Sequence, residues 1–155
     1  MTTTIEQQQA LDVLAQNIEQ WTLDLCSWLQ EDMKQNDINC VKRGLAKAED
    51  GSWEQGYYQK KLEDVMSDNF LPSNRFFVES GRKYFKIMMQ SPVNSDNTKH
   101  QISVHAFVDK KTGQVYKPAS WRGPAKHVRY DLRLIRDRAL LQNKCDWAGG
   151  YLYMR

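Results

Sequence analysis

The stretch Val104–Tyr130, VHAFVDKKTGQVYKPASWRGPAKHVRY, decides the fold because it holds the strongest turn signal of the chain. Asp109 to Gly113 (DKKTG) is typical of a hairpin loop, with glycine at the position where a positive φ is expected. The alternation of apolar and polar residues over 101–108 predicts the strand before this loop. Residues 114–117 predict the returning strand, which Pro118 ends.

A basic helix is predicted after the hairpin, since Pro124 suits the first turn of a helix. An apolar series at spacings of four, three and four would face the core: Val128, Leu132, Ile135 and Ala139. Basic residues would share an adjoining sector: Lys126, Arg129, Arg133 and Arg136. Trp121 lies in the loop before this helix, either as an exposed anchor for a partner or as a plug beneath the loop. Residues 149–153 predict a turn and a short strand at the sheet edge.

Two further strands are predicted upstream, over 75–79 and 82–90, and an exposed, mobile loop over 91–100. In these strands and in 101–108, one face would pack on the helices: Phe85, Ile87, Met89, Ile102, Val104, Ala106 and Val108. Residues 57–66 predict a short helix, and 37–56, which contains three glycines, predicts a connecting region.

The N-terminal part predicts a helix of about 30 residues. Thr3 and Glu6 fit a capping box at its start, and Asn36-Asp37 would stop it. Apolar residues recur at helical spacing: Leu11, Leu14, Ile18, Trp21, Leu25 and Trp28. We favour packing of this face on the protein's own sheet, because tryptophans fit a tight two-stranded seam poorly; a coiled-coil homodimer is the alternative.

Helices, then a meander, then a helix indicate an α+β fold, with residues 1–155 as a single domain in which helix 1–36 joins a core over 57–155. An apolar share of 41% argues against a disordered chain. No run approaches the roughly 20 apolar residues that span a bilayer, and the N-terminus does not resemble a signal peptide. We therefore expect a cytoplasmic protein without a membrane partner. Three separated cysteines are expected to be buried thiols: Cys26, Cys40 and Cys145.

Charge is distributed unevenly along the chain. Residues 1–40 contain seven acids and one base, whereas residues 110–138 contain nine bases and two acids. The basic block could bind a polyanion, form a solvated face, or pair with the acidic N-terminus within the fold.

The sequence offers little to support catalysis. It contains no nucleophile elbow, phosphate-binding loop, zinc-protease motif or dinucleotide fingerprint. The best improvised set is His105, Asp109, Lys117 and Ser120. Within one strand, however, His105 and Asp109 would lie roughly 13 Å apart, too far for a direct dyad. The three histidines lack metal-ligand spacing, so we expect no catalytic residue, metal ion or cofactor.

A binding surface is the better physical case. Cations and aromatic rings would share the sheet face that points away from the helices, where bases can stack while cations track phosphates. This platform would comprise Tyr84, Lys86, His105, Phe107 and Tyr116, extended by Lys117, Trp121, Arg122, Lys126, Arg129 and Arg133. The alternative is that a second helix covers this face and that its aromatic residues are core.

The segment DKKTGQVYKPASWRGPAK (109–126) resembles a family of small uncharacterised proteins of tailed bacteriophages, and DWAGGYLY (146–153) resembles its members in phages of cyanobacteria. The resemblance covers roughly residues 57–155, and the N-terminal helix carries no motif of it. It implies a phage origin and action in the cytoplasm of an infected bacterial cell. It implies no activity and no catalytic residue.

These observations favour a phage-encoded, non-enzymatic binding protein whose target is nucleic acid. The alternative is a protein-binding inhibitor or adaptor that acts on a host factor or a host defence component. Its anchors would be Trp121 and the Trp21 and Trp28 stripe. A small nuclease-like enzyme is the third possibility.

Overall fold

The computed structural model describes residues 4–67, 72–92 and 99–153, and it confirms the α+β class. Five antiparallel strands pair in the order β1-β2-β3-β4-β5, which is a simple meander. The elements are α1 (Ile5–Lys47), α2 (Trp53–Val65), β1 (Arg75–Ser80), β2 (Tyr84–Pro92), β3 (His100–Asp109), β4 (Gln114–Tyr116), β5 (Tyr130–Asp131), α3 (Ile135–Lys144) and a 3-10 turn (Gly150–Leu152).

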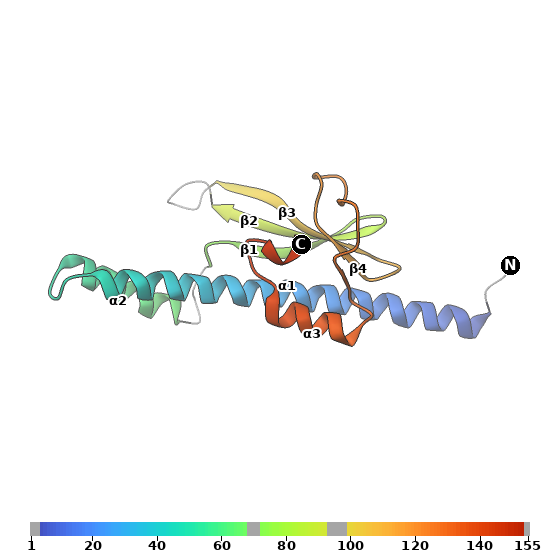
Figure 1. Ribbon diagram of the computed structural model, residues 1–155, viewed down its shortest axis with the longest axis horizontal. Coiled ribbons are helices and arrows are strands. Elements are labelled where there is room, and N and C mark those ends of the chain that lie inside the picture. The colour runs from blue at the N-terminus through green and yellow to red at the C-terminus, as the bar shows by residue number, and fades with distance from the viewer. Residues whose placement is uncertain (1–3, 68–71, 93–98, 154–155) are drawn as a thin grey trace.

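The sheet lies on one side of α1, while α3 packs alongside α1 (Figure 1). The core forms between α1 and the sheet, which confirms the prediction that the apolar face of α1 packs on the protein's own sheet. Its fully buried members include Ile18, Leu25 and Leu29 from α1, Ile87, Ala106, Val108 and Val115 from the sheet, and Leu132 and Leu141 near and within α3.

Helix α1 is longer than predicted, because Asn36-Asp37 does not stop it. The carboxylate of Asp37 accepts hydrogen bonds from the backbone N–H and the hydroxyl of Ser73, so this residue holds the chain that enters β1. At its start, Thr4 is the N-cap and forms a capping box with Gln7; the predicted cap Thr3 lies outside the described residues, and Glu6 lies in the first turn.

The prediction of a connecting region over 37–56 was largely wrong. Helix α1 continues to Lys47, a short turn follows, and α2 starts at Trp53 behind the N-cap Ser52. Gly44, which suggested a break, allows close packing of the two helices: a Cβ there would lie 2.4 Å from the Tyr58 ring.

Strand β3 contains a bulge that the alternation did not predict. Ile87 pairs with Ala106 but Met88 pairs with Val104, so His105 is an extra residue in β3. The prediction that β3 residues face the core is therefore confirmed for Ala106 and Val108. It is wrong for the residues before the bulge, since Ile102 is exposed and Val104 is half-buried outside the core. On β2 the prediction is confirmed, since Phe85, Ile87 and Met89 all lie in or against the core.

The helix predicted from Pro124 does not form. The backbone N–H of Arg129 donates to Val115 O and that of Leu132 to Gly113 O, which ties this segment to β4 instead. Helix α3 starts only at Ile135, which is 76% exposed rather than core-facing. The predicted closing strand is also absent, because Gly149 forms a turn at φ +86° that leads into the 3-10 turn.

Other local predictions had mixed outcomes. Gly113 adopts a positive φ of 70°, as predicted for the hairpin loop. Cys26 and Cys145 are buried, but Cys40 is exposed. Most of the predicted loop over 91–100 lies outside the described residues, and its flanks extend β2 and β3. Within the described parts of the chain, no helix is both long and apolar enough to cross a membrane.

The packing of α1 predicts unequal costs for two leucine truncations on the same helix. Leu25 is fully buried and Leu23 is 45% exposed. We expect Leu25→Ala to lower the free energy of unfolding by about 2–5 kcal/mol, because it leaves a core cavity. Leu23→Ala, the matched control, should change it by about 0.5 kcal/mol or less. Urea unfolding followed by circular dichroism measures both, and equal losses would contradict the observed packing.

Candidate nucleic-acid interface

The side of the sheet that faces away from α1, here called the outer face, carries a cluster of rings and one lysine. Lys86 of β2 pairs with Phe107 of β3, which pairs in turn with Tyr116 of β4. The Tyr84 ring meets the Phe107 and Tyr116 rings edge-on, with centroids 5.6 and 6.3 Å apart. The structure thus brings four of the predicted platform residues together: Tyr84, Lys86, Phe107 and Tyr116.

Residues 117–129, here called the Trp121 loop, fold back over this cluster. An isolated bridge between Pro118 and Pro124 closes the base of the loop. Lys86 Nζ donates a hydrogen bond of 2.8 Å to the Trp121 carbonyl and lies 5.5 Å from the Trp121 ring and 5.7 Å from the Phe107 ring. In the described chain a loop, not the second helix considered from the sequence, therefore covers part of the outer face.

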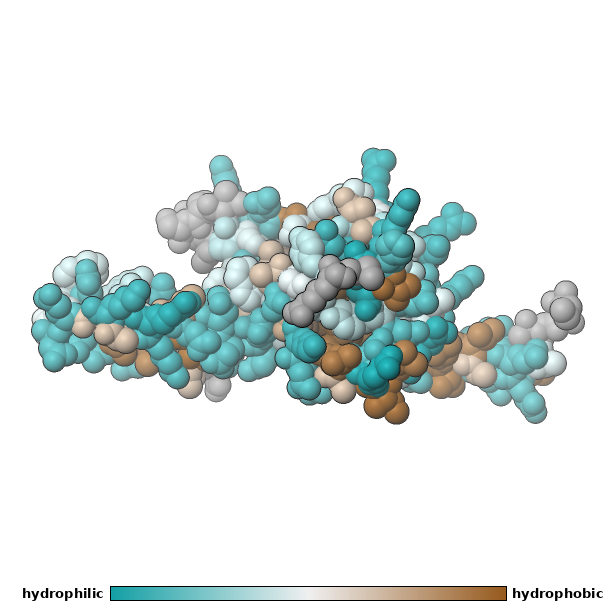
Figure 2. All heavy atoms as spheres, viewed as in Figure 1, coloured by the Kyte–Doolittle hydropathy of each residue, from teal (hydrophilic) through white to brown (hydrophobic). Residues whose placement is uncertain are grey.

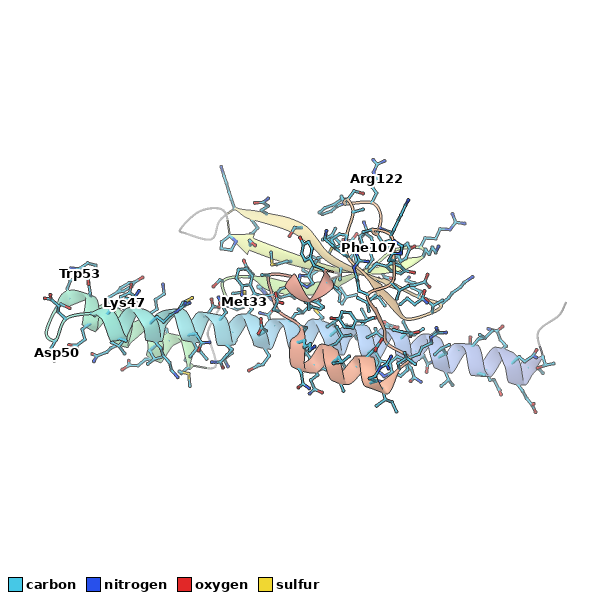
Figure 3. The ribbon with its side chains drawn as sticks, in the orientation of Figure 1. Met33, Lys47, Asp50, Trp53, Phe107 and Arg122 are labelled. Carbon is cyan, nitrogen blue, oxygen red and sulfur yellow. The ribbon has the colours of Figure 1, made fainter. Side chains whose placement is uncertain are left out.

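Trp121 is both a cover and an exposed ring. It remains 51% exposed, although Phe107 is fully buried. Figure 3 shows Arg122 at the outer end of this region, with Phe107 in the sheet beneath. The sequence suggested that Trp121 is either an exposed anchor or a plug beneath the loop. Each is partly correct, since the loop shields Phe107 and about half of Trp121 remains exposed.

Several lysines in this part of the molecule lie over aromatic rings. Lys83 Nζ is 5.3 Å from the centroid of Tyr84, Lys110 Nζ is 4.8 Å from that of Phe85, and Lys117 Nζ is 4.3 Å from that of Tyr153. Among the described residues, the ion pairs are Arg133 with Asp131 and Arg136 with Asp137, and neither involves these lysines. Aromatic stacking holds an ammonium group in place without neutralising it.

Two exposed cations of the Trp121 loop complete this surface. Arg122 and Lys126 are both exposed and take part in neither ion pair described above. One carboxylate borders them on the sheet, because Glu79 of β1 lies opposite Lys86 in register and is exposed. Residues over the sheet are mixed, with teal and pale ones side by side and a few brown, whereas hydrophobic residues gather near α3 and the first part of α1 (Figure 2).

His105 does not belong to the platform. The bulge turns it to the α1 side of the sheet, where it is buried, its ring meets Phe76 edge-on at 5.2 Å, and its Nε2 lies 2.9 Å from the Tyr151 hydroxyl. Burial lowers the pKa of His105 to about 4, against a smaller opposite effect of the Asp146 carboxylate, so the imidazole is neutral at physiological pH.

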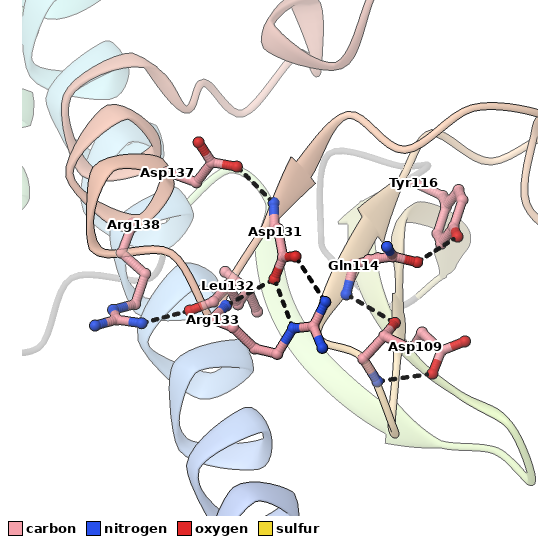
Figure 4. A network of polar contacts seen from close by, with 9 residues as sticks. Asp109, Gln114, Tyr116, Asp131, Leu132, Arg133, Asp137 and Arg138 are labelled. Atoms are coloured by element: carbon pink, nitrogen blue, oxygen red, sulfur yellow. Dashed lines mark hydrogen bonds and ion pairs between the residues drawn. The ribbon is translucent and has the colours of Figure 1, made fainter.

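Arg129 and Arg133, which the sequence analysis assigned to the basic surface, both contact other groups of the fold. Arg129 donates to the carbonyls of Leu152, Lys126 and His127. Arg133 binds Asp131 through two side-chain hydrogen bonds of 3.1 and 2.9 Å (Figure 4). This contact lowers the pKa of the Asp131 carboxyl below its usual value.

The improvised catalytic set is not assembled. The Asp109 carboxylate accepts the backbone N–H groups of Lys111 and Thr112 and so stabilises the hairpin turn. Lys117 stacks on Tyr153, and His105 bonds Tyr151. The Ser120 hydroxyl accepts the backbone N–H of Arg122. His105 and Lys117 line one pocket, but Asp109 and Ser120 are not among its lining residues. No group of three potential metal ligands gathers in the described parts of the chain.

Sequence reasoning missed two residues of this surface. Lys83 lies over the Tyr84 ring, and Tyr153, which is 63% exposed, pairs with Lys117 from the far end of the chain. Lys110 lies over Phe85, a core residue on the α1 side of the sheet, and donates to Ser80, so it does not belong to the outer face. No local sequence pattern indicates that Tyr153 lies near Lys117. The C-terminal segment is held there by hydrogen bonds from Arg129 and Tyr130 to the Leu152 and Tyr151 carbonyls.

One family model matches nearly the whole chain. The family model described as "Family of unknown function (DUF7717)" matches residues 2–154. The match includes α1, which the resemblance noted from the sequence did not cover. No curated protein and no solved structure matches the chain.

The buried His105 predicts a pH dependence of stability. Its pKa is about 4 in the folded protein and near 6.5 when unfolded, so the unfolded state binds more protons between these values. Stability should therefore fall as pH falls, by about 2 kcal/mol from pH 7 to pH 5. In His105→Gln the free energy of unfolding should fall less steeply between pH 7 and pH 5, while the carboxylates still titrate in both proteins. Urea unfolding at several pH values measures this free energy. If it changes equally with pH in the wild type and the variant, the prediction is refuted.

Proposed function

We propose a function for this chain, which belongs to DUF7717, a family of unknown function. The protein binds single-stranded nucleic acid on the outer face and the Trp121 loop. The observation that carries this proposal is the set of lysines held over aromatic rings without carboxylate partners among the described residues. Such a surface offers cations to phosphates and ring faces to unstacked bases.

The exposed rings favour a single strand over a duplex. Trp121 is 51% and Tyr153 is 63% exposed, and Tyr84 and Tyr116 are half-buried. Bases inside a duplex have no free faces, whereas each base of a single strand can stack on a side chain and contribute about 1–3 kcal/mol. A surface for duplex phosphates alone would need cations but no such rings.

The distribution of charge supports the same side of the molecule. Residues 81–130 contain ten lysines and arginines and two acids, whereas residues 1–33 contain six acids and no base. Helix α1 lies on the side of the sheet opposite Arg122 (Figure 3). The acidic first part of α1 therefore disfavours a polyanion, whereas the outer face attracts it.

We further propose that the protein acts in the cytoplasm of an infected bacterial cell, and does so by binding rather than catalysis. The support for the setting is the resemblance of residues 109–126 and 146–153 to phage proteins. The support for the mode of action is that the four groups considered for catalysis do not meet: Asp109 and Ser120 hold local turns, apart from the pocket that His105 and Lys117 line.

A second candidate is protein binding, including a homodimer through α1. It is favoured by exposed apolar residues at the start of this helix, where Leu11 is 55% and Val13 is 56% exposed. The anchors considered from the sequence support it less, because Trp21 and Trp28 are partly buried against the core and Arg138 stacks on Trp21 at 4.3 Å. An apolar interface would respond little to salt, unlike phosphate binding.

Reversal of two exposed loop cations tests nucleic-acid binding. We expect labelled single-stranded DNA or RNA to bind with an affinity that falls steeply with salt, because counterions are released. Arg122→Glu combined with Lys126→Glu should weaken binding about tenfold or more and reduce the salt slope by about one for each cation removed. Fluorescence anisotropy at several salt concentrations measures both quantities.

The matched control is Lys42→Glu with Lys60→Glu, which changes the net charge equally on exposed positions of α1 and α2. It should leave most of the affinity intact. Equal losses in both double variants would indicate a general charge effect. A wild-type protein that binds no oligonucleotide even at low salt would refute the proposed function.

A further inference from the structure

A cavity of about 310 Å³ lies beside β3, next to the Trp121 loop. Its walls come from strands β2 and β3, from the end of β4, and from the C-terminal segment. The lining residues used below are Met89, Ser103, His105, Lys117, Trp147 and Tyr153.

The cavity arises because β4 is short. Strand β4 pairs with β3 only at Phe107 and Val108, so β4 leaves the edge of β3 before these residues uncovered. The C-terminal segment passes beside that edge and is fixed at separate points. The backbone N–H of Trp147 donates to the Asp32 carboxylate of α1, and the backbone carbonyls of Tyr151 and Leu152 accept from Tyr130 and Arg129. These anchors on other elements hold the cavity wall in place.

The chemistry of the lining suits a planar, uncharged heteroaromatic group. Trp147 and Tyr153 offer ring faces and Met89 an apolar contact, while Ser103 and His105 offer hydrogen-bonding groups. His105 is buried, and its Nε2 is engaged with Tyr151. At the mouth, Lys117 lies over the Tyr153 ring, where its ammonium can reach a phosphate next to a bound base.

Met89 and His105 of the lining face the α1 side of the sheet, so the cavity lies around the edge of β3 from the outer face. Lys117 and Pro118 line the cavity and also begin the Trp121 loop, whose tip stacks on Lys86 above the outer face. A nucleic-acid strand that passes from Lys86 to Lys117, around the uncovered edge of β3, therefore reaches the cavity mouth. The volume suits one nucleotide unit and excludes a duplex.

We propose that this cavity receives one unstacked base of the bound single strand, with Tyr153 as its stacking partner and Lys117 on the adjoining phosphate. This inference rests on the proposed function. It adds that one nucleotide of the bound nucleic acid is held more tightly than the others. Because stacking accepts every base face, the hydrogen-bonding groups of the cavity would decide which base is preferred.

Abasic scanning tests the inference. A series of short labelled oligonucleotides, each lacking the base at one position, is titrated against the wild type and against Tyr153→Ala. In the wild type we expect one position whose loss weakens binding about 5- to 100-fold, with small effects elsewhere. In Tyr153→Ala, loss of the base at that position should weaken binding no more than loss at the others, while the affinity still falls with salt. Tyr153 is 63% exposed, so the substitution should not disturb the core.

The chain provides a matched control in Tyr57→Ala. Tyr57 of α2 is 48% exposed and carries Lys61 Nζ 5.3 Å from its ring centroid, a pair like Lys117 and Tyr153 but far along the chain from the cavity. This variant should behave as the wild type in the scan. A loss of position dependence in both tyrosine variants would overturn the assignment of the cavity.

The outcomes separate this inference from the proposed function. Salt-dependent binding with equal sensitivity at all positions overturns the cavity inference and leaves the proposed function intact. No binding of any intact oligonucleotide overturns both. As an independent readout, adenosine, guanosine, cytidine and uridine 5′-monophosphates should shift the amide resonances of Ser103 and Gly149 in the wild type and less so in Tyr153→Ala. Absence of such shifts for all four nucleotides contradicts the cavity inference.

Discussion

Burial of one face of α1 is the constraint on which the rest of the structure depends. Ile18, Leu25 and Leu29 are fully buried against the sheet, and each contributes about 1.5–3 kcal/mol of hydrophobic stabilisation. At 43 residues the helix is about 65 Å long, and only its central part contacts the sheet. The remaining length is paired with α2 toward the C-terminal end, around Ile38 and Val41.

Polar side chains of the same helix fix the position of the other elements. Gln30 donates to the Asn74 carbonyl and accepts from the Phe76 N–H at the start of β1. Asp32 accepts from Trp147 in the C-terminal segment. The helix therefore positions both the first strand and the last segment of the chain, and the edge of β3 and the cavity beside it lie between these two.

Periodicity predicted the elements that local sequence determines, and it failed where distant residues decide. The strands and α1 follow from spacings of 2 and 3.6, and Tyr84, Lys86 and Tyr116 were correctly expected on one face. One extra residue in β3 was enough to move His105 to the opposite face. No rule of spacing reveals such a bulge. Past Asp37, α1 buries Ile38 and Val41 against Val65 of α2, a packing partner that lies well beyond this helix in the sequence.

The basic block illustrates why charge counted along a sequence overstates a binding surface. Of its cations, Arg129 serves three backbone carbonyls, Arg133 serves Asp131, and Arg138 serves the Leu132 carbonyl while stacking on Trp21. A guanidinium group has five donors in a fixed plane, so arginine suits such contacts within the fold. Arg122 and Lys126 of the Trp121 loop remain available to a ligand, as do Lys83, Lys86 and Lys117, which rest on rings. This division, which follows from donor geometry rather than net charge, places the available cations on the outer face and at the mouth of the cavity.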